Sequence, residues 1–521
     1  MTSFKCIDLY SGIGGWTLGM KMSNIINHSS YEWFDQSNLT HNINFNSNNK
    51  EIDIRKLKLN DLPKPGSIDF VVGSPPCTQF SFSNRGGSGD IDDGLVDVYM
   101  FLNIVYHLKP KYWVMENVPR VKNIINDVIS NNIKFKKFKK LITFNEIIDC
   151  SDFGLPQKRK RMICGNFPFE LLMSYKNHCN RTKLEDVIKS LNQKTIVDPT
   201  YGYKLDQNQL TDHNKEETLN WEELRLNKES KTYHPIYNKM NFPDLLNKPS
   251  RTITSTCTRV SRESIVIKDG NGFRRLTLRE KGMIQGFPIT FQFYGNSYSS
   301  KQMMIGNSIP PVLTYYIFQS MLEVNTHQIK NINKIDTYFH NLPKEPVEIT
   351  LPDKYKGSYR KNRSFRFSIP GLRFGSGVRF ELSNKISTNH IKWSVKFFFG
   401  SSKKIQTLEL QSEKISNFVS DNFSDIETKL FDLGKILKDI SSTQLQSVWS
   451  KQSSDSIHPY KFLDVLGNYV KLLKNEIDKI EFEDSIIDQL FDQKYNKKLS
   501  DNMSLFISGL ILGNFVNKGL K

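Results

Sequence analysis

Short apolar runs alternate with helix-compatible segments along the first third of the chain. The strand-like runs lie at 4–10, 68–72, 112–115 and 162–164. A glycine-rich turn at 11–15 (SGIGG) follows the first run, and helix-compatible segments lie at 16–26 and 98–108. Strands and helices that alternate in this order predict an α/β fold, a Rossmann-like doubly wound parallel sheet.

The periodic pattern changes twice further along the chain. Residues 168–250 form a polar stretch rich in Asn, Lys and Glu, which indicates a smaller separate region, and helices are expected at 276–285 and after Pro311. Beyond about Asn331 the runs SFRFSI, GVRFEL and IKWSVKFFF alternate as strands do. Apolar residues within 415–437 then fall on one helical face, so this last part predicts a small α+β domain.

Composition and charge narrow the class of protein. With 38% hydrophobic and 24% charged residues among 521, the chain has the composition of a folded globular protein. Its formal net charge of +18 favours a polyanionic partner, either nucleic acid or an anionic membrane. No apolar run reaches the roughly 20 residues of a membrane-spanning helix, and residues 1–8 lack the pattern of a secretory signal. We therefore expect an intracellular protein that faces nucleic acid, in the cytoplasm or nucleoid if the source is bacterial.

The cysteines give no sign of a metal site or of disulfides. They are scattered along the chain, without a CxxC pair and without a nearby His at ligand spacing, at Cys6, Cys77, Cys150, Cys164, Cys179 and Cys257. We expect no bound metal, and we expect most of these thiols to be reduced and buried.

The glycine-rich turn and two acidic residues outline a candidate cofactor site. Glycines let a ligand approach the backbone, and the next helix presents free amides to it, although such a turn also occurs without a ligand. Glu32 follows the second strand and Asp53 lies near the next. A carboxylate at the first position can accept both ribose hydroxyls of a nucleoside, whereas Asp53 with Ile54 can serve adenine. As isolated acids they would be ordinary surface charges.

Cys77 is the strongest candidate for a nucleophile. It follows the strand at 68–72 and two prolines, and it precedes a polar, glycine-rich segment at 84–94. That places the thiol at the carboxyl edge of the sheet, where ligands bind. The strand at 112–115 ends in Glu116, so the neighbouring edge offers a carboxyl group that could act as a general acid. Without Cys77, a charge at the start of a helix would be the simpler interpretation of Glu116.

Several ordered motifs resemble those of the cytosine-5 DNA methyltransferase family, over roughly 4–319. IDLYSGIGG is similar to the family's cofactor loop, with Tyr10 in place of the usual Phe, and Glu32 with Trp33 is similar to its ribose and adenine contacts. The other motifs, in chain order, are SPPC at 74–77, ENV at 116–118, DFGLPQKRKRMICG at 152–165, RTIT at 251–254, RRLTLREKGMIQGFP at 274–288 and GNSIPP at 306–311. The complete ordered series makes the resemblance specific.

The resemblance implies a methyltransferase sheet that takes S-adenosyl-L-methionine as cofactor and methylates carbon 5 of a cytosine flipped out of double-stranded DNA. Cys77 would attack carbon 6 while Glu116 holds or protonates ring nitrogen 3. Arg159 and Arg161 would contact the base or the nearby backbone, with Gln157 alongside. The implied cofactor residues are Tyr10, Gly12, Gly14, Gly15, Glu32, Trp33, Asp53, Ile54, Pro76, Asn307 and Ser308.

Two positions depart from the family pattern. Thr78 stands where the family usually has Gln, so that Gln79 is displaced by one position, and the loop segment at 90–98 (DIDDGLVDV) lacks the arginine common near its end. These departures put the loop contacts in doubt rather than the reaction, because Cys77 and Glu116 are present.

The resemblance also implies a division of the chain. We expect a catalytic and cofactor-binding domain at 1–166, a small target-recognition domain at 167–303, a return to the catalytic domain at 304–330 and a C-terminal extension at 331–521. The extension's basic residues could form a DNA-backbone surface or the outward face of a hairpin with an aromatic core: Arg360, Lys361, Arg363, Arg366, Arg373 and Arg379.

Two other kinds of protein would fit the same motifs. An RNA cytosine methyltransferase could use the same scaffold, and so could a DNA-binding protein that has lost catalysis, although the intact Cys77 and Glu116 speak against the second. The protein would act as a monomer on DNA, and residues 412–521 could serve self-association or a partner. Modification within a restriction system is one role that fits.

Overall fold

The computed structural model describes residues 3–81, 89–232, 240–335, 341–352, 359–375, 377–387, 390–401, 404–410, 413–423, 426–479 and 502–520. The chain divides into two units. Unit 1 comprises Met1–Lys231 with Asn241–Asp353, and unit 2 comprises Thr232–Met240 with Lys354–Lys521. Part of the glycine-rich segment expected at 84–94 lies outside the described residues.

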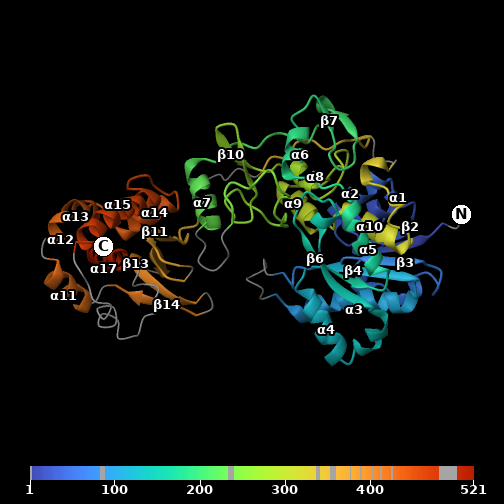
Figure 1. The fold of residues 1–521 in the computed structure, drawn as a ribbon, viewed down its shortest axis with the longest axis horizontal. Coiled ribbons are helices and arrows are strands. Elements are labelled where there is room, and N and C mark those ends of the chain that lie inside the picture. The colour runs from blue at the N-terminus through green and yellow to red at the C-terminus, as the bar shows by residue number, and fades with distance from the viewer. Residues whose placement is uncertain are drawn as a thin grey trace. The chain divides into compact units, whose positions relative to one another are not determined.

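A six-stranded sheet in the order β2-β1-β3-β4-β6-β5 organises unit 1 (Figure 1). Its strands are β1 (Lys5–Leu9), β2 (Ile26–Tyr31), β3 (Phe70–Gly73), β4 (Tyr112–Asn117), β5 (Phe144–Asp149) and β6 (Lys160–Gly165). The first four run parallel, as expected, but β6 pairs antiparallel with both β4 and β5. The expectation that the strand at 162–164 would be parallel is therefore wrong. A short connection through the one-turn helix Cys150–Phe153 joins β5 to β6, and only antiparallel neighbours can be joined without a crossover.

Helices cover both faces of this sheet, which confirms the doubly wound α/β class. On one face, α1 (Gly15–Met22) and α10 (Pro311–Met321) share a core with alternate strand residues such as Val114. On the other face, α3 (Ile91–Leu108) and α4 (Val121–Asn131) share a core with the intervening strand residues, among them Trp113. Strand side chains alternate between the faces, so the central strands β1, β3 and β4 are buried on both sides.

Helix α10 packs closely on α1 although about 300 residues separate them. The Thr314 hydroxyl donates to the carbonyl of Gly15 at 2.9 Å, across 299 positions. A Cβ atom at Gly15 would lie 2.2 Å from the carbonyl oxygen of Ile309. The backbone of the glycine turn is thus supported by the far end of the unit.

The remaining α-helices and strands of unit 1 lie outside the central sheet. They are α2 (Asp35–Phe45), α5 (Phe169–Ser174), α6 (Leu184–Ser190), α7 (Trp221–Thr232), α8 (Leu278–Ile284), α9 (Tyr298–Asn307), and two hairpins made of β7 (Thr195–Val197) with β8 (Lys204–Asp206) and β9 (Val266–Asp269) with β10 (Gly272–Arg275). The helix expected at 276–285 is α8, which Thr277 and Glu280 begin with a capping box.

Unit 1 extends beyond Asn331, where we expected the extension to begin. The main-chain atoms of Val347 accept from the Thr211 hydroxyl at 2.8 Å and donate to Gln292 at 2.9 Å. Lys301 donates to Thr350 at 2.7 Å. These bonds hold the segment 341–352 on unit 1, so the division falls at Asp353 instead.

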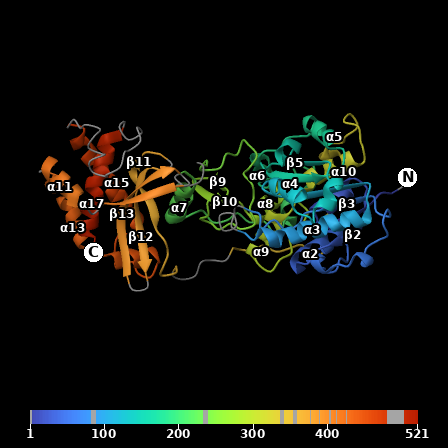
Figure 2. The same ribbon diagram turned by 90° about the horizontal axis from the view of Figure 1, so that it is seen from below.

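Unit 2 is an α+β unit, as expected. Its antiparallel sheet contains β11 (Arg366–Arg373), β12 (Arg379–Ser387), β13 (His390–Ser401) and β14 (Lys404–Glu409), visible in Figure 2. The helices are α11 (Glu413–Asn422), α12 (Ile426–Lys429), α13 (Phe431–Lys438), α14 (Ser442–Trp449), α15 (Pro459–Ile477) and α17 (Met503–Gly519). The apolar face at 415–437 is therefore spread over three short helices. In the described part of the chain, α17 included, no helix has both the length and the apolar character needed to cross a bilayer.

Candidate active site

The candidate catalytic residues meet at the carboxyl edge of the central strands. Strand β3 ends at Gly73, and Ser74 and two prolines lead from it to Cys77. Asn117, the last residue of β4, donates its side-chain amide to the carbonyl of Pro75 at 3.0 Å. That bond ties the nucleophile segment to the strand that carries Glu116, as the adjacent strand ends predicted.

Cys77 is half-buried, and the amides of Phe80 and Ser81 both donate to its carbonyl at 3.0 Å. Burial raises the pKa of the thiol, and the charge of Glu116 adds to that shift, whereas Arg161 and, more weakly, Arg159 lower it. The thiol therefore holds its proton more firmly than a free cysteine does, and its nucleophilic form depends on the two arginines.

Glu116 and Arg161 form a nearly buried ion pair. Arg161 Nε lies 2.8 Å from Glu116 Oε1, with the side chains 11% and 6% exposed. Antiparallel pairing sets this contact, because Glu116 lies opposite Ile163 and Asn117 opposite Met162. The ion pair uses Glu116 Oε1, which leaves Oε2 for a substrate atom.

Arg159 lies deeper than Arg161. Its guanidinium is buried and donates to the carbonyls of Ile253 at 3.1 Å, Gly306 at 2.7 Å and Ser308 at 3.1 Å. Burial, together with the charge of Arg161, lowers its pKa to about 9. Arg159 thus joins the RTIT and GNSIPP segments, and Arg161 is the arginine that the structure places on the acid.

Gln157 is also buried and binds within the protein. Its amide donates to Gln285 at 2.9 Å, and its oxygen accepts from the amide of Ile253 at 2.9 Å. Like Arg159, it fixes the strand edge around the site.

The glycine turn leads from β1 into α1 and binds Glu32. Gly14 has φ 95°, a left-handed conformation suited to glycine, and it caps α1. The amide of Gly12 donates to Glu32 at 2.9 Å, and the amides of Trp33 and Phe34 donate to the same carboxylate at 2.9 and 2.8 Å. Burial raises the pKa of Glu32 and these three amides oppose the shift.

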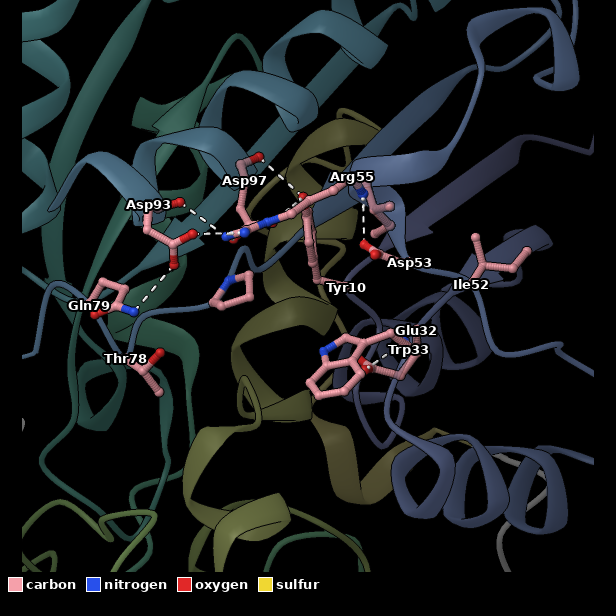
Figure 3. A pocket seen from close by; sticks show the side chains of 13 residues that line it. Tyr10, Glu32, Trp33, Ile52, Asp53, Arg55, Thr78, Gln79, Asp93 and Asp97 are labelled. Carbon is pink, nitrogen blue, oxygen red and sulfur yellow. Dashed lines mark hydrogen bonds and ion pairs between the residues drawn. The ribbon is translucent and has the colours of Figure 1, made fainter. Parts of the chain in front are cut away.

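Beside this turn lies a pocket of about 330 Å³. Of the expected cofactor residues, the pocket is lined by Tyr10, Glu32, Trp33, Asp53, Ile54 and Pro76 (Figure 3). Trp33 is 63% exposed, so its indole ring is free to contact a ligand. Gly12 reaches the pocket only through Glu32. The other expected residues, Gly14, Gly15, Asn307 and Ser308, do not line it.

The rest of the pocket lining was not anticipated from the sequence. Its further lining residues are Ile52, Arg55, Thr78, Gln79, Asp93, Gly94 and Asp97. The sequence did carry one signal: Asp93 and Asp97 are four residues apart on a helix, where two like charges need a cation beside them. No group of three His, Cys, Asp or Glu side chains that could hold a metal occurs among the described residues.

The basic residues singled out in the extension are largely engaged within unit 2. The Arg363 guanidinium lies 3.7 Å from the ring centroid of Tyr359 and 3.6 Å from that of Trp449. Arg379 is buried and pairs with Glu381. Phe365 and Phe380 are buried as well, an arrangement that fits a sheet with an aromatic core.

Known proteins are similar to the first two thirds of this chain. A family model described as C-5 cytosine-specific DNA methylase matches residues 4–323. The Type II methyltransferase M.HindV of Haemophilus influenzae is 29% identical over 339 residues, which cover 63% of this chain and 99% of that protein. The Type II methyltransferase M.FnuDI of Fusobacterium nucleatum is 26% identical over 344 residues, covering 63% and 96%. The solved Entamoeba histolytica methyltransferase EhMeth is 18% identical, with coverages of 62% and 99% and a TM-score of 0.43.

Proposed function

This chain belongs to the C-5 cytosine-specific DNA methylase family, and on that premise we propose that it methylates carbon 5 of cytosine in double-stranded DNA. The cytosine is flipped out of the helix and forms a covalent adduct with Cys77, and S-adenosyl-L-methionine is the methyl donor. The observation that carries the proposal is the meeting of the Cys77 segment, the Glu116–Arg161 pair and the pocket at one strand edge. Pro76 and Thr78, on either side of Cys77, both line the pocket.

The pocket fits a nucleoside cofactor. Trp33 offers an exposed ring for stacking, the Glu32 carboxylate can accept ribose hydroxyls, and Asp53 with Ile54 suits the adenine edge and face. S-adenosyl-L-methionine, when bound, supplies an electrophilic methyl group. The residues that line the pocket would hold it beside the nucleophile segment, because Pro76 and Thr78 line the same pocket.

Cys77 and Glu116 divide the chemistry on the base. The Cys77 thiolate forms a bond to carbon 6 while Glu116, as the acid, shares or gives a proton to ring nitrogen 3, so that electron density moves to carbon 5. Carbon 5 would then take the methyl group, with S-adenosyl-L-homocysteine as the leaving group. A base removes the carbon-5 proton, the bond between carbon 6 and sulfur breaks to return the thiolate, and the proton on ring nitrogen 3 returns to Glu116. Arg161 holds the Glu116 side chain and lowers the pKa of the Cys77 thiol, so it serves both groups.

The position of the site requires the base to leave the helix. Cys77 is half-buried and Glu116 is 4% exposed, so a cytosine stacked in duplex DNA cannot reach both. Flipping brings the base to them. Residues 167–249 would read the target sequence, because this stretch lies between the DFGLPQKRKRMICG and RTIT segments and is rich in side chains that contact phosphates and base edges.

A role in restriction-modification is the biological setting we propose. M.HindV and M.FnuDI are both named Type II methyltransferases. The net charge of +18 suits a DNA substrate.

Two measurements test the proposed reaction. Purified protein is incubated with S-adenosyl-L-methionine and duplex DNA, and bisulfite sequencing then reads any methylated cytosines and their sequence context. Transfer RNA is assayed in parallel, because activity on RNA alone would replace DNA as the substrate. A wild-type protein that leaves all DNA unmodified would contradict the proposal.

The nucleophile is tested by substitution. Cys77→Ser is expected to abolish methyl transfer and the covalent complex with 5-fluorocytosine DNA, while S-adenosylhomocysteine still binds. The matched control is Cys179→Ser, because Cys179 is also half-buried and its thiol donates to the carbonyl of Tyr175 at 3.2 Å. Turnover by Cys77→Ser would refute the assigned nucleophile.

A further inference from the structure

A hydrogen-bonded network crosses the pocket and ends at Gln79 (Figure 3). Arg55 donates to Asp97 through Nε at 3.0 Å and Nη2 at 2.7 Å, and to Asp93 through Nη1 at 2.8 Å. Asp97 also accepts from the Tyr10 hydroxyl at 3.2 Å. Asp93 accepts from the Gln79 side chain at 3.3 Å. The network therefore runs from the glycine turn to a residue two positions after Cys77.

The charges of the network make Arg55 its centre. Asp93 and Asp97 lie one turn apart on α3, where two carboxylates repel each other. In the described part of the chain, Arg55 is the cation that pairs with either of them. Its hydrogen bond lowers the pKa of Asp93, and the two aspartates raise the pKa of Arg55 in turn. Asp97 is 6% exposed, so without Arg55 it would be a nearly buried, uncompensated charge.

Arg55 joins two walls of one pocket. It directly follows Asp53 and Ile54, the residues suited to adenine, in the one-turn helix Ile54–Lys56. The facing wall comes from the nucleophile segment and from α3. Gln79 also holds the start of α3, because its side-chain oxygen accepts from the amide of Asp90 at 3.0 Å. A ligand that fills the pocket therefore touches both walls that Arg55 connects.

Positions at which the sequence departs from the usual family pattern meet here. The Tyr10 hydroxyl, which a phenylalanine would lack, donates to Asp97. Gln79 is displaced by one position and binds Asp93. The segment 90–98 supplies two aspartates and no arginine, and the cation comes from Arg55 on the other wall. Each departure is thus matched by a partner within the network.

We infer that Arg55 is a positioning residue that couples occupancy of the cofactor pocket to the position of the Cys77 segment. The inference rests on the proposed function. Arg55 acts through Asp93 and Gln79 rather than on the reacting atoms. Because coupling between two sites is reciprocal, a bound cofactor steadies the nucleophile segment and an ordered segment strengthens cofactor binding.

The test measures how S-adenosylhomocysteine changes the reactivity of Cys77. Each cysteine's alkylation by iodoacetamide is followed by mass spectrometry, with and without S-adenosylhomocysteine at a concentration that saturates each variant. In the wild type, we expect bound S-adenosylhomocysteine to slow alkylation of Cys77 by about fivefold or more. Cys179 and Cys257, which are also half-buried, serve as internal controls for global opening.

The quantity compared is the ratio of the Cys77 alkylation rate without S-adenosylhomocysteine to the rate with it. Variants of the network should change this ratio for Cys77 and not for the control cysteines. Arg55→Gln should bring the ratio for Cys77 to within about twofold of one, whereas Arg55→Lys, which keeps the cation, should retain most of the protection. Tyr10→Phe removes one bond to Asp97 and should give an intermediate ratio even if Arg55→Gln folds poorly. Lys111→Gln is the matched control, because it breaks a 2.9 Å ion pair with Glu323 that is not part of the pocket.

The outcomes separate this inference from the proposed function. Wild-type protein that does not methylate DNA removes the proposed function and the inference with it. Wild-type protein that methylates DNA but shows no effect of S-adenosylhomocysteine on Cys77 overturns the coupling alone. The coupling is equally overturned if Arg55→Gln keeps the wild-type ratio, or if it binds no S-adenosylhomocysteine at any concentration, which would make Arg55 a direct ligand contact.

Discussion

Replacing Arg161 by Gln removes the cation that the structure places on Glu116. The pair is 2.8 Å apart and its side chains are 11% and 6% exposed, so the carboxylate would be left with little compensation from water. Breaking a buried pair on one side costs about 3–5 kcal/mol, a large part of the roughly 5–15 kcal/mol that holds a domain folded. We expect Arg161→Gln to lower the urea midpoint of unit 1 and to stop methyl transfer.

The double variant separates the two effects. Adding Glu116→Gln to Arg161→Gln removes both charges, so most of the lost stability should return. Methyl transfer should not return, because the acid is gone. A double variant that is as unstable as Arg161→Gln would refute the unpaired carboxylate as the source of the loss.

The Cys77 thiol provides a second readout of the same charges. Arg161 lowers the pKa of this thiol and Glu116 raises it, and only the thiolate reacts with iodoacetamide. In Arg161→Gln the alkylation profile should therefore move to higher pH, with the rate at pH 8 falling about tenfold for each unit of pKa. Glu116→Gln should move the profile to lower pH. If both variants give the same pH profile of alkylation as the wild type, neither the Arg161 charge nor the Glu116 charge affects the pKa of the Cys77 thiol.

Two further predictions concern the frame of the site. Gly15→Ala should abolish binding of S-adenosylhomocysteine and lower the free energy of unfolding by about 1–3 kcal/mol through overpacking, because the new Cβ would lie 2.2 Å from the carbonyl oxygen of Ile309. Calorimetry and ligand titration measure the two effects. Gly375→Ala is the control, because a Cβ there meets nothing within 4 Å. A chain that ends after Asn331 should melt at a lower temperature than one that ends after Asp353, because the segment 341–352 hydrogen-bonds to unit 1. Equal melting temperatures in circular dichroism would contradict the placement of the end of unit 1 at Asp353.

The sequence predicted the centre of the fold well because the strands of a buried parallel sheet are continuous apolar runs. The runs at 4–10, 68–72 and 112–115 became β1, β3 and β4 with only small changes at their ends. The direction of β6 could not be predicted in this way, since an apolar run of three residues looks the same in either orientation. Direction depends on the short connection from β5, which carries no periodic signal.

The two arginines of the QKRKR stretch show a similar limit. Arg159 and Arg161 are two residues apart, so both project to the same side of the chain, and their spacing does not tell which one meets the acid. The pairing of Asn117 with Met162 decides this, because it brings Arg161 to Glu116. Register across a sheet is a tertiary property.

The pocket residues on α3 could not be predicted from the sequence for another reason. The stretch DIDDGLVDV has four aspartates and a glycine, which resemble a loop, yet α3 begins at Ile91. Asp90 caps this helix by accepting from the amide of Asp93 at 3.1 Å, and acidic residues suit a first helical turn. Gly94 is needed because a Cβ there would lie 2.6 Å from the ring of Phe80.

The support of the glycine turn by α10 also sets when the site can form during translation. The Thr314 hydroxyl reaches the carbonyl of Gly15 across 299 positions. At about 5–20 residues per second, the ribosome adds Thr314 roughly 15 to 60 s after Gly15. Until α10 leaves the exit tunnel, the nascent chain contains the glycines and the thiol but lacks the helix that holds the turn. We therefore expect methylation to begin only when unit 1 is almost fully synthesised, so that incomplete chains released early carry the motifs without the activity.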